Sequence, residues 1–357
     1  MDTDNNAKGN KKIKIMNPWI TVPDETKRRA YIETAERIGL SAFAAEKDWW
    51  VVQTLSVVFG IDVSAHLVFK GGTSLSKGWK IIDRFSEDVD LALDRAFLGF
   101  DGELSKNERG KLRKETGLYV DNVFYPELID EFASKGYDNV RLELVKEKQS
   151  DLDRKISIYY PNVIDAPGYL QPAVQIEISC RSLREPFSMR SIRSHLDEVF
   201  PDAGFIQPPA IIPTVNPERT FLEKIFLLHE EFHRPAEKRR VNRLSRHLYD
   251  VVKLSKTSFA EKALADRALY ETIVYHRYHF TRVGEVNYNL HQPQTINPIP
   301  PVELMEAWKA DYNGMIEQMI YEENPPAFGE IISDLEELTK KINSLEWRFD
   351  LEFPQPK

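Results

Sequence analysis

The 357-residue sequence contains one cysteine, Cys180, so the chain cannot form an internal disulfide bond. A single cysteine is typical of proteins that work in a reducing compartment. No apolar run is close in length to a membrane-spanning helix, which needs about 20 residues. The polar N-terminus also lacks the apolar middle segment of a secretory signal peptide. These absences predict a cytoplasmic protein without a membrane partner.

Positive charge is also in deficit, because the formal net charge is −8. An acidic chain does not coat nucleic acid indiscriminately, although a local basic segment can still bind it. Such a segment spans residues 234–246, RPAEKRRVNRLSR, in which Glu237 is the only acid. It is either a solvated face whose charge balances acidic segments elsewhere in the chain, or a binding site for a polyanion such as RNA. The candidate RNA-binding residues are Lys238, Arg239, Arg240, Arg243 and Arg246.

Hydrophobic periodicity divides the chain into two parts. The first part mixes strand-like and helical patterns, with strands expected at 66–70, 88–93, 139–147, 155–161 and 173–179 and helices at 25–38, 41–59, 74–83 and 103–135. The second part has only helical patterns, at 216–232, 240–255, 258–278, 302–321 and 328–345. We therefore predict an α+β or α/β domain over residues 21–213, with a mixed sheet and flanking helices, and a helical domain over 214–357. Residues 1–20 are predicted to be a mobile tail.

Two glycines, Gly71 and Gly72, separate a predicted strand from a predicted helix. Glycine permits positive φ and lets a ligand approach the backbone closely. The free N–H groups at the start of the helix suit a phosphate, and the hydroxyls of Thr73 and Ser74 would add donors. A purely structural turn is the alternative, because the spacing is not that of a P-loop.

Asp88 and Asp90 alternate on the strand that follows, so both carboxylates lie on one face while Val89 and Leu91 lie on the other. This face is either solvated or a site for Mg²⁺ or Mn²⁺, because hard cations take carboxylate oxygens together with substrate phosphates. Glu177 would add a third carboxylate if the strand at 173–179 pairs beside 88–93.

The segment GGTSLSK…RFSEDVDLAL resembles the signature of the polymerase-β-type nucleotidyltransferases. In that signature a turn of glycine, then glycine or serine, then serine or threonine precedes two acids at alternate positions of a strand. More narrowly, the chain is similar to the AbiEii/AbiGii (MenT-like) toxin family over roughly residues 40–345. The blocks that carry this similarity are AEKDWWV (45–51), LEKIFLLHE (222–230), SRHLYDVVKL (245–254) and DYNGMIEQMIY (311–321). One departure is the spacing between Thr73 and Asp88, where fourteen residues slightly exceed the usual gap.

The resemblance implies a magnesium-dependent enzyme that transfers a nucleoside monophosphate from an NTP to RNA, most simply to the 3′ end of tRNA. It also implies a role in phage defence and a cognate antitoxin encoded nearby. Two alternatives remain open: transfer to a protein or a small molecule, and a catalytically dead subunit that only binds an antitoxin.

Lys224 lies within an apolar helical stripe formed by Phe221, Ile225 and Leu228. There it either extends to solvent or binds a buried anion such as a triphosphate, and the resemblance implies the second role. Asp250 is either an ordinary pairing acid or, as the resemblance implies, an active-site residue that organises Lys224 or the acceptor hydroxyl. The candidate catalytic residues are Asp88, Asp90, Glu177, Lys224 and Asp250, and the candidate nucleotide-binding residues are Gly71, Gly72, Thr73, Ser74, Arg84 and Lys224.

Overall fold

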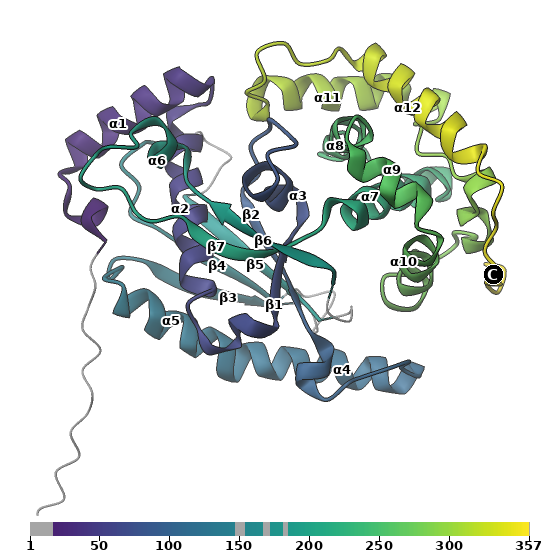
Figure 1. The fold of residues 1–357 in the computed structure, drawn as a ribbon, viewed down its shortest axis with the longest axis horizontal. Helices are drawn as coiled ribbons and strands as arrows, with labels where there is room; N and C mark the ends of the chain where they lie inside the picture. The colour runs from purple at the N-terminus through teal and green to yellow at the C-terminus, as the bar shows by residue number, and fades with distance from the viewer. Residues whose placement is uncertain (1–16, 147–153, 167–171, 181–184, 357) are drawn as a thin grey trace, which may run out of the picture.

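The computed structural model of the chain describes residues 17–146, 154–166, 172–180 and 185–356. Its centre is a seven-stranded mixed sheet with the order β3-β4-β5-β2-β1-β7-β6 (Figure 1). The strands are β1 (Leu67–Lys70), β2 (Asp88–Leu93), β3 (Arg141–Lys146), β4 (Arg154–Tyr159), β5 (Ala173–Ser179), β6 (Phe187–Ile192) and β7 (Ala210–Val215). The pairs β2–β5 and β1–β7 are parallel, and the other pairs are antiparallel.

Five of these strands match the sequence prediction, but β6 and β7 were not predicted. Pro213 lies inside β7, and proline removes a ladder donor and lowers strand propensity. β6 is an edge strand with two serines and an arginine, so it lacks a continuous apolar face. The predicted domain limit at residue 213 therefore falls inside a strand.

Helices α1 (Asp24–Ile38), α2 (Ala42–Val58), α4 (Lys106–Tyr119), α5 (Tyr125–Ser134) and α6 (His195–Val199) flank the sheet. The side chains of Val89, Leu91 and Leu93 pack into one apolar core with α2 and α5. The predicted helix at 103–135 is confirmed as α4 and α5, which a π-helical turn at Val120–Phe124 joins.

The folded part begins before the predicted end of the tail. Residues 1–16 lie outside the described residues, but Pro18–Thr21 form a 3₁₀ helix. The Trp19 side chain is 1% exposed, and its indole Nε1 donates to the hydroxyl of Tyr31 at 2.8 Å. Its ring also contacts those of Trp49 and Phe205. Trp19 thus belongs to the core of the sheet domain, and Ile20 packs against that core.

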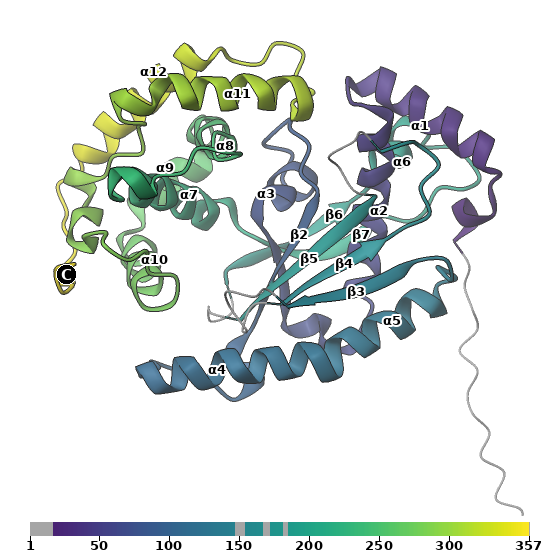
Figure 2. The ribbon, with the colours of Figure 1, turned by 180° about the vertical axis from the view of Figure 1, so that it is seen from behind.

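The second half contains α7 (Pro217–Phe232), α8 (Arg246–Ser255), α9 (Ser258–Ala265), α10 (Arg267–Phe280), α11 (Met305–Met319) and α12 (Phe328–Asn343). Figure 2 shows these helices gathered beside the sheet, and their apolar faces form a second core. The mixed sheet with flanking helices and the helical second half confirm the predicted fold class. No helix in the described part of the chain is both long and apolar enough to cross a membrane.

Three predicted helices differ from the structure. The helix predicted at 240–255 begins only at Arg246, because Arg243 has a φ of +61° that a helix cannot accommodate. The basic run is therefore a loop with a short 3₁₀ turn, Ala236–Lys238, and not part of a continuous helix. The helix predicted at 258–278 divides at Asp266, whose side chain caps α10. The helix predicted at 74–83 is shorter, with α3 (Gly71–Thr73) followed by a π-helical turn, Ser74–Gly78.

The loop between this turn and β2 crosses into the helical half. Ile82 joins the second core, and the backbone N–H of Phe85 donates to the carbonyl of Met319 at 2.6 Å. The N–H of Tyr321 donates to the carbonyl of Asp83 at 3.0 Å. These contacts bring the end of α11 against the residues that precede β2.

If Trp19 is part of the core, Trp19→Ala should lower the free energy of unfolding by about 3–5 kcal/mol, as expected for a large buried aromatic side chain. Chemical denaturation followed by circular dichroism measures this. Ile32→Ala is the matched control, because Ile32 is 42% exposed on α1 and its loss should change stability by less than about 0.5 kcal/mol. Equal stability of the Trp19 variant and the wild type would place residues 17–20 outside the core.

Candidate active site

The glycine turn is shaped by a close approach to β2. Gly71 has a φ of +81°, and a Cβ there would lie 1.9 Å from Oδ2 of Asp90. A Cβ on Gly72 would lie 2.5 Å from Nη2 of Arg84. A side chain at Gly71 would therefore both strain the backbone and displace a carboxylate, so this position requires glycine.

The two hydroxyls after the turn are used within the protein. Thr73 Oγ1 donates to the carbonyl of Asp88 at 2.6 Å, and Ser74 Oγ donates to the carbonyl of Gly71 at 2.8 Å. Both side chains are fully buried. In this structure the Thr73 hydroxyl thus ties the turn to β2 and the Ser74 hydroxyl bonds within the turn, and their role as phosphate donors stays a prediction. The first backbone N–H groups of α3 remain available to bind an anion.

Asp88, Asp90 and Glu177 lie on adjacent strands, since β5 pairs directly beside β2, which is the condition on which Glu177 was a candidate. Asp90 is opposite Glu177 on one side and Lys70 on the other. Burial, and then the charge of Glu177, raise the pKa of Asp90 to about 6. Burial, followed by the charges of Glu87 and Glu177, also raises the pKa of Asp88.

These carboxylates do not form a ready three-ligand metal site. Among the described residues, no group of three or more His, Cys, Asp or Glu side chains is arranged to hold an ion. Glu177 instead forms an ion pair with Lys155 at 2.9 Å. Asp88 and Asp90 nevertheless fit a divalent cation, because they are two half-buried carboxylates on one face of β2, and burial followed by neighbouring negative charge raises the pKa of each. Glu177 could join them only by leaving Lys155.

A buried ion cluster faces the carboxylates from the helical half. Asp250, which is fully buried, accepts from Arg84 Nε at 2.7 Å and Nη2 at 2.8 Å, and its Oδ2 lies 2.8 Å from Lys224 Nζ. Burial would raise the pKa of Asp250, but Arg84 and Lys224 outweigh it and hold that pKa well below its usual range. Two cations against one carboxylate leave an excess positive charge, which suits a polyphosphate.

His247 and Arg246, at the start of α8, complete this cluster. His247 Nδ1 lies 3.3 Å from Lys224 Nζ, and burial and then Lys224 hold the pKa of His247 well below its ordinary value. The neutral imidazole thus accepts a hydrogen bond from the Lys224 ammonium. Sequence reasoning did not identify His247, although its position one helical turn before Asp250 is a usable signal. Arg246 interacts electrostatically with both Asp250 and Asp88.

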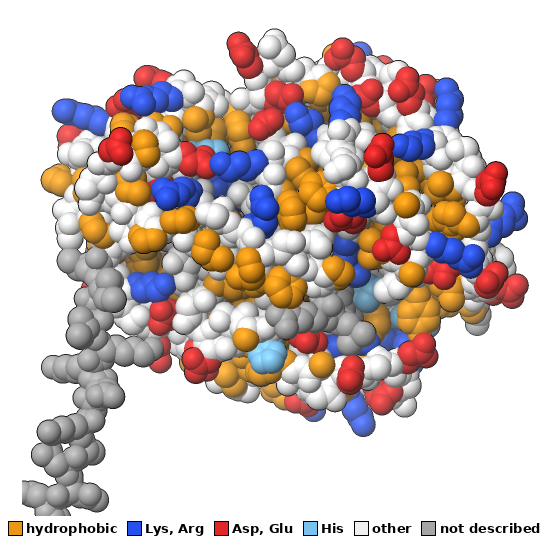
Figure 3. Space-filling model, in the orientation of Figure 1, with side chains coloured by type: hydrophobic (Ala, Val, Ile, Leu, Met, Phe, Trp, Pro, Cys, Tyr) orange, Lys and Arg blue, Asp and Glu red, His pale blue; other side chains and the backbone are white. Residues whose placement is uncertain are grey.

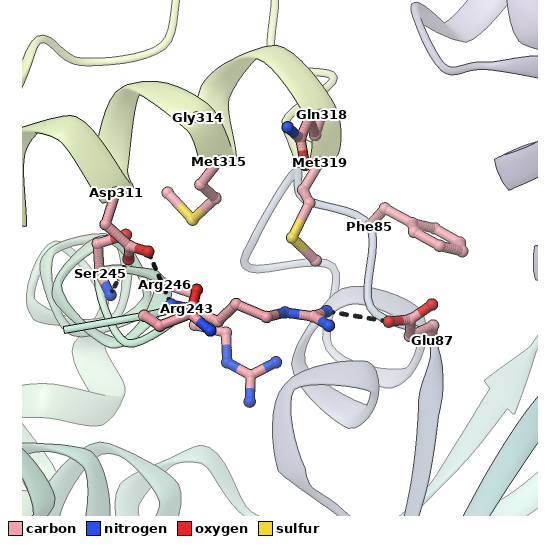
Figure 4. Close-up of a pocket in the computed structure, with 11 residues that line it drawn as sticks. Phe85, Glu87, Arg243, Ser245, Arg246, Asp311, Gly314, Met315, Gln318 and Met319 are labelled. Atoms are coloured by element: carbon pink, nitrogen blue, oxygen red, sulfur yellow. Dashed lines mark hydrogen bonds and ion pairs between the residues drawn. The ribbon is translucent and has the colours of Figure 1, made fainter. Parts of the chain in front are cut away.

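A cavity of about 460 Å³ adjoins the cluster, between the residues that precede β2, the loop before α8, and α11 (Figure 4). Arg243 extends across it to Glu87, with 3.0 Å between Nη2 and Oε1. Asp311 accepts the backbone N–H groups of Arg243 at 2.7 Å and Ser245 at 3.0 Å. Residues 311–319 thus build one wall of a cavity that begins at Glu87, next to Asp88.

The basic run is largely neutralised. Four of the five candidate RNA-binding residues form ion pairs: Lys238 with Glu285, Arg239 with Glu303, Arg240 with Glu231, and Arg243 with Glu87. Arg246 makes no ion pair with any described carboxylate. Figure 3 shows acidic and basic side chains interspersed over the helical half on this face. The run therefore has much less excess charge than its sequence suggests.

A sequence profile described as "nucleotidyl transferase AbiEii toxin, type IV TA system" matches residues 61–334. This match includes the glycine turn, both aspartates, and α7, α8 and α11, and it defines the chain as a nucleotidyltransferase. The chain belongs to the AbiEii toxin family of type IV toxin–antitoxin systems.

The fold is also similar to solved structures, at low identity. MenT4, a nucleotidyltransferase toxin of Mycobacterium tuberculosis, is 14% identical, with 90% of this chain and 98% of that chain covered and a TM-score of 0.45. JHP933 of Helicobacter pylori is 14% identical, with 85% and 93% covered and a TM-score of 0.42. A putative nucleotidyltransferase of H. pylori is 14% identical, with 83% and 93% covered and a TM-score of 0.42. A search of curated proteins finds no significant match.

The buried cluster depends on the charge of Asp250. Asp250→Asn should lower the free energy of unfolding by about 3–5 kcal/mol, because it leaves the buried cations Arg84 and Lys224 facing each other. Asp83→Asn is the control, since Asp83 is 48% exposed and pairs with Lys253 at 3.5 Å, and such a pair contributes about 1 kcal/mol or less. Urea unfolding curves compare the two variants. Similar small losses in both would show that the cluster contributes little to stability.

Proposed function

We propose that this nucleotidyltransferase transfers a nucleoside monophosphate from an NTP to an RNA hydroxyl, with the 3′ end of tRNA as acceptor. The observation that carries the proposal is the pair of half-buried carboxylates, Asp88 and Asp90, on one face of β2 next to a turn that requires glycine. Opposite them is a buried cation cluster built on Lys224, Arg84 and Asp250. Membership of the AbiEii family supports the same chemistry.

In this proposal Asp88 and Asp90 hold Mg²⁺ or Mn²⁺. A bound ion of this kind neutralises charge on the phosphates and stabilises the charge that develops during transfer. Lys224 and Arg84 bind the triphosphate, and the N–H groups of the Gly71–Gly72 turn orient it. Asp250 acts as a positioning residue, because its carboxylate holds the Lys224 ammonium and the Arg84 guanidinium in fixed directions.

The reaction then follows from in-line geometry. The acceptor oxygen forms a bond to the α-phosphorus, the bond between the α-phosphorus and its bridging oxygen to the β-phosphate breaks, and pyrophosphate leaves. The acceptor hydroxyl must therefore approach from the side opposite the leaving group. We assign to Glu177 the support of this hydroxyl, because it is the cross-strand neighbour of Asp90 and 41% of its side chain is accessible. The hydroxyl proton passes to Glu177 or to water.

The family implies a partner as well as a substrate. We expect a cognate antitoxin encoded nearby, loss of growth when the enzyme acts alone, a contribution to phage defence, and action in the cytoplasm. The catalytically dead alternative is disfavoured, since a subunit that only binds an antitoxin has no need for the glycine turn, the carboxylates and the buried lysine together.

Asp88→Asn and Asp90→Asn should each reduce nucleotidyl transfer by roughly 100-fold or more, because each removes a charge next to the reacting phosphate. The assay incubates protein with radiolabelled NTPs, Mg²⁺ and total RNA. Asp94→Asn is the matched control: Asp94 accepts the N–H of Ala96 at 3.0 Å, a role that asparagine also performs, so transfer should be unchanged. Unchanged transfer in either site variant would falsify the assignment.

The same assay separates the acceptor classes. Label on RNA supports the proposal, and label on protein supports transfer to a side chain. No label with any of the four NTPs supports the dead-subunit alternative. A Mn²⁺ titration provides a second readout, since binding should weaken in Asp90→Asn and not in Asp94→Asn.

The acceptor end can be identified in cells. Sequencing of RNA 3′ ends after brief expression should show extra nucleotides on tRNA that are absent when the Asp88→Ala variant is expressed. Identical 3′ ends in the two samples, together with RNA labelling in vitro, would point to an internal hydroxyl instead.

A further inference from the structure

A second cavity, of about 610 Å³, lies between the start of α4, the loop that follows β2, and α10. Arg95 and Arg109 line one side, and Tyr275, His279 and Phe280 of α10 line the other. Figures 1 and 2 show α4 and α11 at opposite ends of the boundary between the two halves, with α3 and β2 between them. The two cavities thus lie on different sides of the carboxylates.

The cations of this second cavity differ from those of the basic run in what they bind. Arg109 Nη1 donates to the carbonyl of Leu104 at 2.6 Å. Arg113 does not line the cavity itself but lies one turn further along α4, where its Nη2 donates to the carbonyl of Phe280, a lining residue, at 3.2 Å. Arg95 donates to the carbonyl of Gly102. None of the three forms an ion pair with a described carboxylate. A carbonyl orients a guanidinium without cancelling its charge.

Arg95 has a further donor to offer. Its side chain is only 6% exposed, and its Nε has no hydrogen-bond partner among the described residues. A buried donor of this kind is costly unless a ligand satisfies it. Two acids also line the cavity, but Asp266 accepts the N–H of Leu269 as the cap of α10, and Glu103 is exposed.

Aromatic rings alternate with these cations. The Phe280 ring lies 5.3 Å from the guanidinium carbon of Arg95 and 5.8 Å from that of Arg109. The rings of Tyr275 and His279 lie 4.2 Å apart on the same wall. A groove that combines arginines with aromatic faces is suited to single-stranded nucleic acid, whose phosphates bind the cations and whose bases stack.

Charged side chains connect the lining of this cavity with the carboxylate site. Arg219 lines it and forms an ion pair with Glu223 at 3.0 Å. Burial would raise the pKa of Glu223, but Arg219 and Lys70 lower it to about 2. Lys70 is in turn the cross-strand neighbour of Asp90. A chain of neighbouring charged residues therefore leads from the cavity to Asp90.

We propose that the cavity between α4 and α10 binds the single-stranded end of the RNA acceptor and leads it to the carboxylates. The inference rests on the proposed function, and it leaves the cavity beside Glu87 for the nucleotide. It moves the main RNA contacts from the ion-paired run at 234–246 to Arg95, Arg109 and Arg113.

The test measures binding of a short, unstructured, fluorescent oligoribonucleotide by anisotropy, without NTP and at several salt concentrations. The double variant Arg109→Gln/Arg113→Gln should bind about tenfold or more weakly, and its salt slope should fall by about 1–2, as expected for the loss of one or two phosphate contacts. Arg239→Gln/Arg240→Gln is the matched control and should stay within about twofold of wild type, because its arginines are already paired with Glu303 and Glu231. Arg109→Lys/Arg113→Lys should restore most of the binding and the slope, which separates charge from folding.

Equal losses in the cavity variant and the control, or no loss in the cavity variant, would overturn the inference. The inference would also be overturned if polyglutamate displaced the fluorescent RNA as efficiently as unlabelled RNA does. That result would indicate a site for acidic polypeptides. The outcome is independent of the transfer reaction. If the cavity variant binds RNA normally and still transfers label to it, only the cavity assignment fails. If the wild-type protein binds RNA in this cavity but none of the four NTPs gives labelled RNA, only the proposed function fails.

Discussion

The buried contact of Asp250 with Arg84 and Lys224 is the interaction on which the rest of the molecule depends. Arg84 comes from the loop before β2, whereas Asp250 and Lys224 come from α8 and α7. A buried carboxylate cannot stay ionised without such partners, and two buried cations cannot stay together without the carboxylate. The contact therefore fixes the helical half against the sheet and, in the same step, sets the position of the lysine that faces the aspartates.

The second constraint is the space around Asp90. A glycine with positive φ lets the end of β1 pass directly over this carboxylate, and Thr73 ties the following turn to the backbone of Asp88. The turn and the strand are consequently one rigid unit. Asp88 and Asp90 remain close despite their raised pKa values because the backbone, and not their own interaction, holds them there.

Local patterns predicted the parts of the fold that depend on local sequence. Alternation along 88–93 and 173–179 indicated which side chains share a face of each strand, since a strand has a period of two, and the pairing of β2 with β5 then brings Asp88, Asp90 and Glu177 together. β7 escaped prediction because Pro213 contradicts strand propensity and only pairing with β6 and β1 compensates for it. The free charge of the basic run was overestimated for a related reason: the partners Glu285 and Glu303 are distant in sequence, and no local pattern reveals them.

The passage of residues 79–87 into the helical half has a consequence for synthesis of the chain. The N–H of Phe85 and the carbonyl of Asp83 bond to the backbone of Met319 and Tyr321, so the approach to β2 is incomplete until those residues are present. A nascent chain still being translated, or one truncated before α11, carries both aspartates but lacks the wall that orders the loop in front of them. In such a chain the loop that leads to Asp88 lacks the backbone hydrogen bonds to Met319 and Tyr321, so we expect both aspartates to be held less rigidly than in the full chain.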